Sequence, residues 1–305
     1  MKFVHSPRAA AALALCVLSL PLASCSTPGA QESASPQPSR NITLTLAVPA
    51  DPTGQAIGNV YADALERLGY TVKISKSSSA PYQQVAEGKA DLAIDTAAQA
   101  VSLVPAAKPR GADGILSLQE SADLVNTINQ QDLGFTAAPL SAANAGKVMV
   151  LSAAEAAEYK IDSLPTLAAA CTKVGFVDDV QPSSGLKTVL AEAGCDTPQF
   201  TTEKTEDLPD TLRTAVDQVV ALQAQDALIG DEGFKTVDGS SQLFDAEPYM
   251  PLMGTAVDED AAKGVKEVTR TLSQEAVIGL NRLVQGPDGV SPQDAAGRWK
   301  WLIDN

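Results

Sequence analysis

The sequence reads ITLTLAVPADPTG from residue 42 to residue 54, and this stretch points to the fold class. Branched apolar residues alternate with threonines over residues 42–48, which predicts a β-strand, and prolines and a glycine then predict a loop. Apolar residues recur at helical spacing over residues 57–68, and Gly69 ends that pattern. Residues 70–74 predict a second strand, 82–88 a short helix and 91–94 a third strand. This order is typical of an α/β protein with a mostly parallel sheet.

Three runs in this region, TGQAIGNVY (residues 53–61), LERLGYTV (65–72) and EGKADL (87–92), resemble the opening of the glycine-betaine-type solute-binding proteins of ABC importers. Similar segments follow in order in the second half, so the resemblance covers roughly residues 42–303. It implies a two-lobed fold of the type II periplasmic-binding-protein kind. Each lobe would be a mostly parallel sheet flanked by helices, with a ligand cleft between the lobes. It also implies a binding protein rather than an enzyme.

The composition argues against several classes of function. The chain carries 37 acidic and 22 basic residues, a net charge of −15, and no basic cluster with interleaved aromatic residues. We therefore expect no nucleic acid as a partner. The single histidine, His5, lies in the leader described next, which excludes histidine-dependent nucleophiles and histidine metal sites. We expect no catalytic residue, no metal and no cofactor, although an exported enzyme that uses carboxylates or lysine remains an alternative.

The N-terminus has the pattern of an export signal. Lys2 and Arg8 precede a mostly apolar run over residues 9–22, which is too short to span a membrane. The run ends in LASC at residues 22–25, which resembles the bacterial lipobox. We expect a signal peptide over residues 1–24 and a diacylglycerol on Cys25, because two acyl chains hold a protein stably on a membrane. The alternative is ordinary secretion with a chance cysteine.

Residues 25–40 are rich in serine, proline, glutamine, glycine and alanine, so they cannot bury a core and predict a flexible tether. A coil of this length reaches about 20 Å. We therefore expect a globular domain held at the cell membrane, on its extracytoplasmic face.

The second half of the chain predicts a second lobe of similar build. Residues 220–229 resemble residues 85–94, and both are interpreted as a helix end, an aspartate and a buried strand. Residues 208–224 accordingly predict one long helix. The helical tail of the chain is expected to cover the first lobe, with Trp299 and Trp301 packed there rather than contacting ligand.

The chain must cross between two such lobes at least twice, and residues 135–141 and 244–251 are the best candidates. Lobe 1 then comprises residues 41–137 and 248–305, and lobe 2 comprises residues 138–247.

Loops that follow the strands of a parallel sheet meet at one edge, and ligand contacts are expected there. Structural roles remain alternatives for Ser79, in a polar turn, and for Ser183, at a helix start. The pair Asp231 and Glu232 is expected after a strand, either as a solvated turn or as the partner of a cationic group. The predicted ligand-binding residues are Thr53, Gln55, Ser79, Tyr82, Asp95, Thr96, Asn144, Ser183, Asp231, Glu232 and Tyr249.

The ligand class follows from the charges and rings of these loops. The family that the sequence resembles holds quaternary ammonium groups in a box of aromatic rings, but here Thr96 and Ala145 stand at two positions where it tends to have a ring. The rings that remain near the expected cleft are Tyr82, Phe176, Phe234 and Tyr249. The loops instead carry the acids Asp51, Asp95, Asp178, Asp179, Asp231 and Glu232, with no Lys or Arg before Lys235. We expect a small cationic or zwitterionic solute of the glycine betaine and quaternary amine class, bound by hydrogen bonds and carboxylates.

These features predict a lipid-anchored substrate-binding protein that presents a small molecule to a membrane-embedded ABC permease. The alternative is an envelope lipoprotein of the same fold that acts as a sensor or structural partner and has no role in transport.

The chain has four cysteines, of which Cys16 would leave with the leader and Cys25 would carry the lipid. Cys171 and Cys195 remain, and an exported protein meets an oxidising environment, so a disulfide between them is predicted. The alternative is two free buried thiols.

Replacing the predicted lipidation site (Cys25→Ser) should release the protein from membranes or leave the leader uncleaved, because the attachment point is lost. Membrane fractionation and mass spectrometry of the mature N-terminus test this. An unmodified mature N-terminus at another residue would contradict the lipid anchor.

Overall fold

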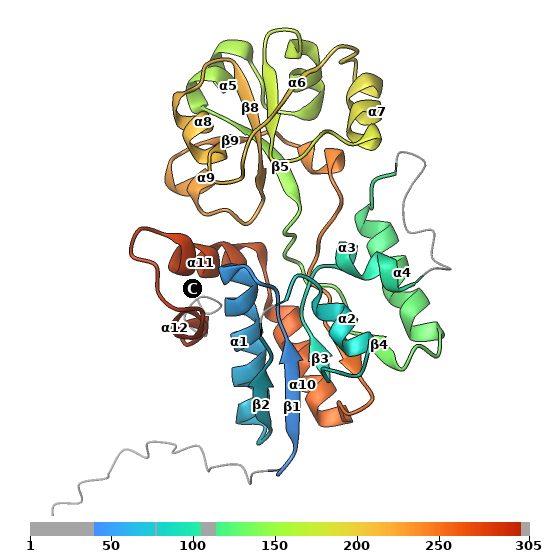
Figure 1. Ribbon diagram of the computed structural model, residues 1–305. Helices are drawn as coiled ribbons and strands as arrows, with labels where there is room; N and C mark the ends of the chain where they lie inside the picture. The colour runs from blue at the N-terminus through green and yellow to red at the C-terminus, as the bar shows by residue number, and fades with distance from the viewer. Residues whose placement is uncertain (1–39, 77, 105–113, 300–305) are drawn as a thin grey trace, which may run out of the picture. The chain divides into compact units, whose positions relative to one another are not determined.

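The computed structural model describes residues 40–76, 78–104 and 114–299 (Figure 1). The predicted signal peptide, Cys25, nearly all of the tether and Trp301 lie outside these residues. Within the described ranges, no helix is both long and apolar enough to cross a membrane.

The first sheet consists of β1 (Thr43–Ala47), β2 (Thr71–Ile74), β3 (Leu92–Ala93), β4 (Phe135–Ala137) and β10 (Leu252–Gly254). Its strand order is β2-β1-β3-β10-β4. β1 is parallel to β2 and β3, whereas β10 is antiparallel to β3 and β4. The helices α1 (Pro52–Arg67) and α2 (Pro81–Ala86) connect the first three strands. The predicted strand–helix–strand–helix–strand order is therefore confirmed.

The second sheet consists of β5 (Lys147–Leu151), β6 (Gly175–Asp178), β7 (Gln199–Thr202), β8 (Gln218–Gln223) and β9 (Lys235–Thr236). Its order is β7-β6-β8-β5-β9. β6 is parallel to β7 and β8, and β5 is antiparallel to β8 and β9. Each sheet is thus mostly parallel with one strand reversed, and in both sheets that strand lies second from an edge.

Helices flank both sheets (Figure 1). The first sheet has, besides α1 and α2, α3 (Ala97–Ala100), the 3-10 turn η1 (Val101–Leu103), α4 (Leu118–Gln130), α10 (Glu259–Thr271), α11 (Gln274–Gln285) and α12 (Pro292–Ala296). The second has α5 (Ala153–Tyr159), α6 (Leu164–Ala170), α7 (Ser184–Glu192), α8 (Leu208–Thr214), α9 (Leu228–Asp231) and the 3-10 turn η2 (Ser240–Leu243).

The long helix predicted over residues 208–224 is wrong. α8 ends at Thr214, Asp217 adopts a left-handed backbone with φ of 60°, and β8 follows. β8 pairs with a strand on each side, and its consecutive apolar residues are buried. Periodicity cannot distinguish such a continuous apolar run from a buried helix. The predicted match of residues 220–229 to residues 85–94 is wrong for the same reason, because a strand comes first there and the helix α9 second.

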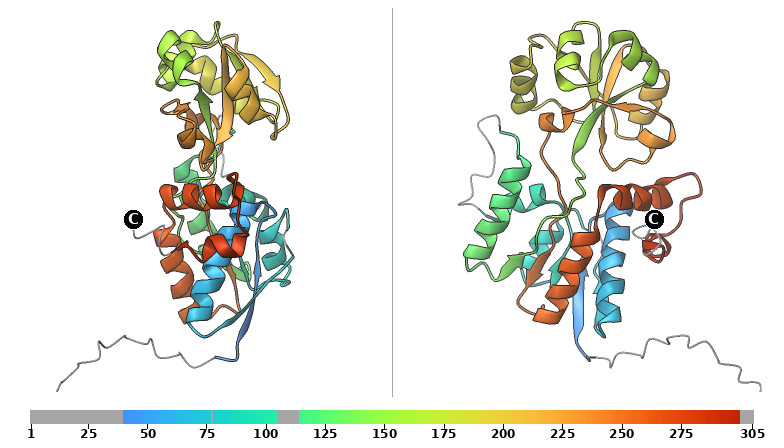
Figure 2. Two further views of the ribbon diagram at one scale, coloured as in Figure 1. Left: turned by 90° about the vertical axis from the view of Figure 1, so that its left-hand side faces the viewer. Right: turned by 180° about the vertical axis from the view of Figure 1, so that it is seen from behind.

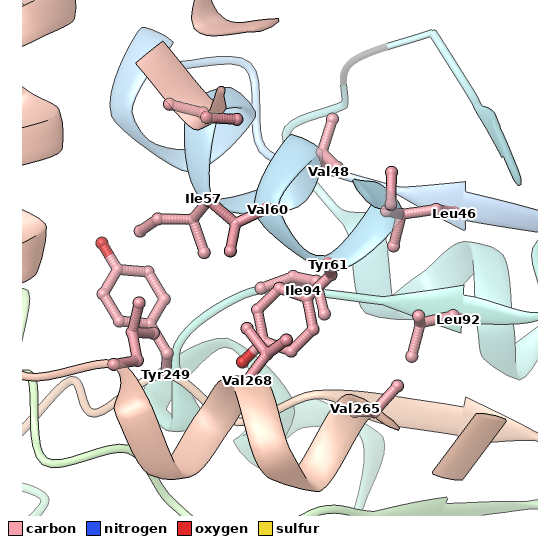
Figure 3. Packing of buried hydrophobic residues seen from close by; sticks show 14 of the residues in the cluster. Leu46, Val48, Ile57, Val60, Tyr61, Leu92, Ile94, Tyr249, Val265 and Val268 are labelled. Carbon is pink, nitrogen blue, oxygen red and sulfur yellow. The ribbon is translucent and has the colours of Figure 1, made fainter. Parts of the chain in front are cut away.

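The helix α1 organises the core of the first sheet (Figure 3). A Cβ atom added at Gly58 would lie 2.2 Å from Cγ1 of Val48, so only glycine lets the helix approach the sheet this closely. α10, α11 and α12 also contact α1 (Figure 2), and the buried hydroxyls of Tyr61 and Thr269 share a hydrogen bond of 3.0 Å. Trp299 is 6% exposed within this core, which confirms its predicted packing role.

The core of the second sheet contains the predicted disulfide. Cys171 and Cys195 are joined with their Cα atoms 5.8 Å apart, and both are buried. The bond closes a loop that contains β6 and α7, with a sequence separation of 24. In the chain-entropy description, a loop of this size stabilises the fold by about 3 to 4 kcal/mol.

Two chain segments, residues 138–146 and 244–251, run between the sheets and are hydrogen-bonded to each other. Backbone bonds of 2.8 to 2.9 Å join them along their length, from Ala138 N to Pro251 O, from Ser141 N to Tyr249 O and from Ala145 N to Glu247 O. The second crossing lies where the sequence predicted it. The first begins after residue 137 rather than at residue 135, because Phe135–Ala137 forms β4.

The helix α11 makes a further connection to the turn that follows β8. Asn281, 4% exposed, donates from Nδ2 to Thr53 Oγ1 at 3.1 Å and accepts from the Ala227 N–H at 3.0 Å. Gln274 donates to Ala224 O at 3.1 Å and accepts from the Asn144 N–H at 2.8 Å. Each amide side chain uses both of its ends, so neither can be replaced without leaving a polar group unpaired.

Replacing Asn281 with alanine should lower the free energy of unfolding by about 1 to 3 kcal/mol, because the buried Ala227 N–H and the Thr53 hydroxyl lose their partner. Urea unfolding measures this. The control is Asn126→Ala on α4, where the side chain is exposed. Equal effects of the two substitutions would contradict the structural role of Asn281.

Candidate functional site

A cavity of about 240 Å³ lies where the second sheet meets the crossing segments. One wall is the loop after β6, which leads into α7, and another is the second crossing segment. The start of β5 and two residues that precede α4 complete it. The lining residues are Gly114, Ile115, Lys147, Asp178, Val180, Gln181, Pro182, Ser183, Leu186, Leu243, Phe244, Asp245 and Glu247.

The charges of this cavity are mostly negative. Among the described residues that line it, Asp178, Asp245 and Glu247 are acidic and Lys147 is basic. The Lys147 ammonium contacts Asp178 Oδ1 at 2.5 Å and also binds Asp179. Burial raises the pKa of Asp178 despite this contact. Burial also acts to raise the pKa of Asp179, but hydrogen bonds from Lys147 and Thr205 outweigh it, so the pKa of Asp179 is lowered. The lysine is therefore already engaged by two carboxylates.

Asp95, beside the first sheet, is linked through Thr96 to Glu247, which lines the cavity. Asp95 follows β3, is 9% exposed and accepts a hydrogen bond from the Thr96 N–H at 2.8 Å. The Thr96 hydroxyl in turn donates to Glu247 Oε2 at 3.4 Å. Burial, then the nearby charges of Glu247 and Asp51, raise the pKa of Asp95 to about 7. Burial and the neighbouring Asp245 likewise raise the pKa of Glu247.

Several residues predicted as ligand contacts form hydrogen bonds within the protein and are not among the described residues that line this cavity. The buried Thr53 accepts from Asn281, and Gln55 donates to Ala50 O at 2.7 Å. Tyr82 is 2% exposed, and its hydroxyl donates to Asp95 O at 2.6 Å and to Met250 O. These bonds connect α2 to the residues that follow β3 and precede β10.

The crossing segments use two more of the predicted residues. Asn144 Oδ1 accepts from the Gly146 N–H at 3.0 Å and from the Glu247 N–H at 2.7 Å. Tyr249 is 3% exposed, faces the first core (Figure 3) and donates from its hydroxyl to Gln225 Oε1 at 2.5 Å. Both residues position the cavity wall that carries Glu247.

The two predicted serines lie in different settings. Ser183 lines the cavity and caps α7, accepting from the Leu186 N–H at 3.0 Å, so both of its predicted roles are compatible with its position. Ser79 is exposed in the loop before α2 and is not among the residues that line the cavity.

The acidic pair predicted to follow a strand lies elsewhere. Asp231 ends the helix α9, and Glu232 follows it. Asp231 accepts hydrogen bonds from Arg282 at 2.7 to 3.0 Å, and Glu232 accepts from Arg213 at 2.5 to 2.8 Å. They line a separate pocket of about 430 Å³, formed by α9 and α11. The expectation that these carboxylates lack basic neighbours is therefore wrong, since each contacts an arginine. The loop sequence did not reveal these contacts because both arginines are distant in sequence.

Aromatic rings are scarce at the cavity. Phe176 and Phe234 pack in hydrophobic clusters of the second sheet, and Tyr82 and Tyr249 are buried as described. Phe244 is the one ring among the lining residues. The sequence reading missed Phe244, Asp245, Glu247 and Lys147 as site residues. The signal available for Glu247 was its place in the predicted crossing segment 244–251, two residues before Tyr249.

The site offers carboxylate and hydroxyl oxygens but no recognisable metal centre. Among the described residues, no group of three or more His, Cys, Asp or Glu side chains is placed to hold a metal ion. The arrangement of acids around one engaged lysine is suited to binding a cationic group.

Comparisons with known proteins identify relatives. The family model described as the substrate binding domain of ABC-type glycine betaine transport system (OpuAC) matches residues 42–300. No curated protein sequence matches the chain.

Solved structures share the fold at low sequence identity. A glycine betaine/carnitine/choline ABC transporter structure has 15% identity and a TM-score of 0.70 over 86% of this chain and 100% of that chain. Apo YehZ from Escherichia coli has 14% identity and a TM-score of 0.63, over 86% and 98%. Lactococcal OpuAC, closed on glycine betaine, has 13% identity and a TM-score of 0.53, over 87% and 98%. These likenesses establish the type II periplasmic-binding-protein fold.

The raised pKa of Asp95 makes a pH-dependent contribution to stability. The folded protein keeps this proton up to about pH 7, whereas the unfolded chain releases it near pH 4, so this contribution falls as the pH rises through that window. Wild type should therefore lose about 2 to 4 kcal/mol relative to Asp95→Asn between pH 4 and pH 7.5. Urea unfolding of both proteins measures the difference, and Asp196→Asn, at an exposed carboxyl, is the control. A difference that stays constant with pH would contradict this account.

Proposed function

The chain belongs to the family of substrate-binding domains of ABC-type glycine betaine transport systems, and we propose that it binds a small cationic or zwitterionic solute for import. Glycine betaine and choline, for which related transport proteins are named, fall within this chemical class. In this proposal the protein passes its ligand to a membrane-embedded permease.

The observation that carries the ligand class is the charge of the cavity. Among the described residues that line it, three are acidic and one, Lys147, is basic, and this lysine already contacts Asp178 and Asp179. An anion would be desolvated beside like charges, whereas a cation would gain partners. Among the predicted contacts we propose Asp95, Thr96 and Ser183 as ligand neighbours, and we add Asp178 and Glu247.

We propose the two lobes in the boundaries expected from the sequence, residues 41–137 with 248–305 and residues 138–247. The composition of the two sheets supports this division, since each sheet draws its strands from one of these sets. The paired crossing segments would act as the hinge about which the lobes close on the ligand.

Attachment to the membrane is part of the same proposal. The LASC sequence that ends at Cys25 supports a lipid anchor, and residues 25–40 would separate that anchor from the first strand. The protein would then work on the extracytoplasmic face of the cell membrane, beside its permease.

A ligand screen by thermal unfolding tests the proposed function. Choline, ethanolamine, glycine betaine, proline and putrescine represent cations and zwitterions, and succinate and sulfate represent anions. A true ligand at 100 times its Kd should stabilise the protein by about 2.7 kcal/mol, which raises the Tm by about 5 to 10 °C. Mass spectrometry should recover that ligand unchanged. Stabilisation by the anions alone, or conversion of the ligand to a product, would contradict the proposal.

A further inference from the structure

We infer that the cavity selects, among small organic cations, those that carry N–H groups over those whose nitrogen is fully methylated. This inference rests on the proposed function and concerns the same site. Glu247 is the residue that we assign as the main determinant of this choice.

The cavity lacks the surface that a fully methylated nitrogen requires. Such a nitrogen carries a charge but no donor, so proteins hold it by the faces of aromatic rings. Phe244 is the one ring among the described residues that line the cavity, and it also packs against the core of the second sheet. The hydroxyls of Tyr82 and Tyr249 form buried hydrogen bonds within the protein, which fixes both rings outside the lining. One ring cannot enclose a trimethylammonium group.

The cavity does offer acceptors with unused capacity. Glu247 Oε2 has one long hydrogen bond, 3.4 Å from the Thr96 hydroxyl, and no other hydrogen bond reaches this carboxylate from the described residues. At Asp178, Lys147 and the Asp179 N–H both bind Oδ1, and among the described residues none donates to Oδ2. An ionised carboxylate can accept about four hydrogen bonds, so both groups can take further donors.

Covering these oxygens with methyl groups would be unfavourable. A ligand that enters the cavity displaces water from the carboxylates, and each lost hydrogen bond must be replaced to avoid a desolvation penalty. An ammonium or guanidinium group replaces it with a short, charge-assisted bond. A trimethylammonium group supplies charge alone and leaves the acceptors without donors.

The lysine in the cavity does not remove the need for a cation. Lys147 lies between Asp178 and Asp179, whose carboxylates use its charge. Glu247 lines another wall of the cavity, in the crossing segment. A ligand with an N–H cation would therefore complete the hydrogen bonding of Glu247, to which the Thr96 hydroxyl is the other donor.

Two methylation series test the inference by titration calorimetry on the full chain. The first runs from ethanolamine through its mono- and dimethyl forms to choline, and the second runs from glycine through sarcosine and dimethylglycine to glycine betaine. The charge stays constant within each series, while each step replaces one N–H group with a methyl group. Affinity should fall along a series, by about tenfold or more between its ends.

The variant Glu247→Gln keeps the shape of the side chain and removes its charge. It should weaken binding of the unmethylated member about tenfold and weaken binding of the trimethyl member less, since that member loses only the attraction of the charge, so that affinities within a series differ less. The matched control is Glu192→Gln, at an exposed glutamate on α7, which should leave the fall in affinity along each series unchanged. The series on the unsubstituted protein decides the question even if Glu247→Gln does not fold.

The outcomes separate this inference from the proposed function. If choline and glycine betaine bind more tightly than ethanolamine and glycine, the inference is overturned while the proposed function stands. If no member of either series binds, the inference is overturned, and the proposed function falls as well if proline and putrescine also fail to bind. A slope that persists unchanged in Glu247→Gln would overturn the assignment to Glu247.

Discussion

The pairing of the two crossing segments is the constraint on which the rest of the structure depends. Asn144 Oδ1 holds the backbone of both segments, since it accepts from the N–H groups of Gly146 and Glu247. A Cβ atom at Gly146 would lie 2.6 Å from Asp245 O, so the segments can pass this closely only at glycine. The same pairing fixes the backbone that carries Asp245 and Glu247 into the cavity wall. The pairing of the crossing segments and one wall of the cavity therefore depend on the same few residues.

The fold could be predicted from the sequence wherever one periodicity dominated. Over residues 42–94 the alternation of strands and helices is marked by Gly69 and by prolines, and the structure follows it. Residues 208–231 are different, because a doubly buried strand and a helix share the same continuous apolar composition there. The pairing of β8 with β5 and β6 makes this segment a strand, and these partners are too distant in sequence for the local pattern to reveal them.

The site was harder to predict because its chemistry depends on partners distant in sequence. The strand-end position of Asp95 and Asp178 was visible as a pattern, and both are buried carboxylates. Whether an acid is free for a ligand depends on where the basic residues lie. Arg282 comes to Asp231 from 51 positions away, and Lys147 comes to Asp178 from 31 positions away. These separations in sequence explain why the sequence alone did not show which acids have a basic partner.

The position of β10 has a consequence for how the chain folds during export. β10 lies between β3 and β4, although it follows them by more than a hundred residues. β4 therefore has no neighbour in its sheet until residues 252–254 have crossed the membrane, whereas the second sheet has all its strands by residue 236. Since chains emerge from their N-terminus, the second sheet, which lies between β4 and β10 in the chain, can form its core and its disulfide first. The half that begins the sequence is the last to be completed.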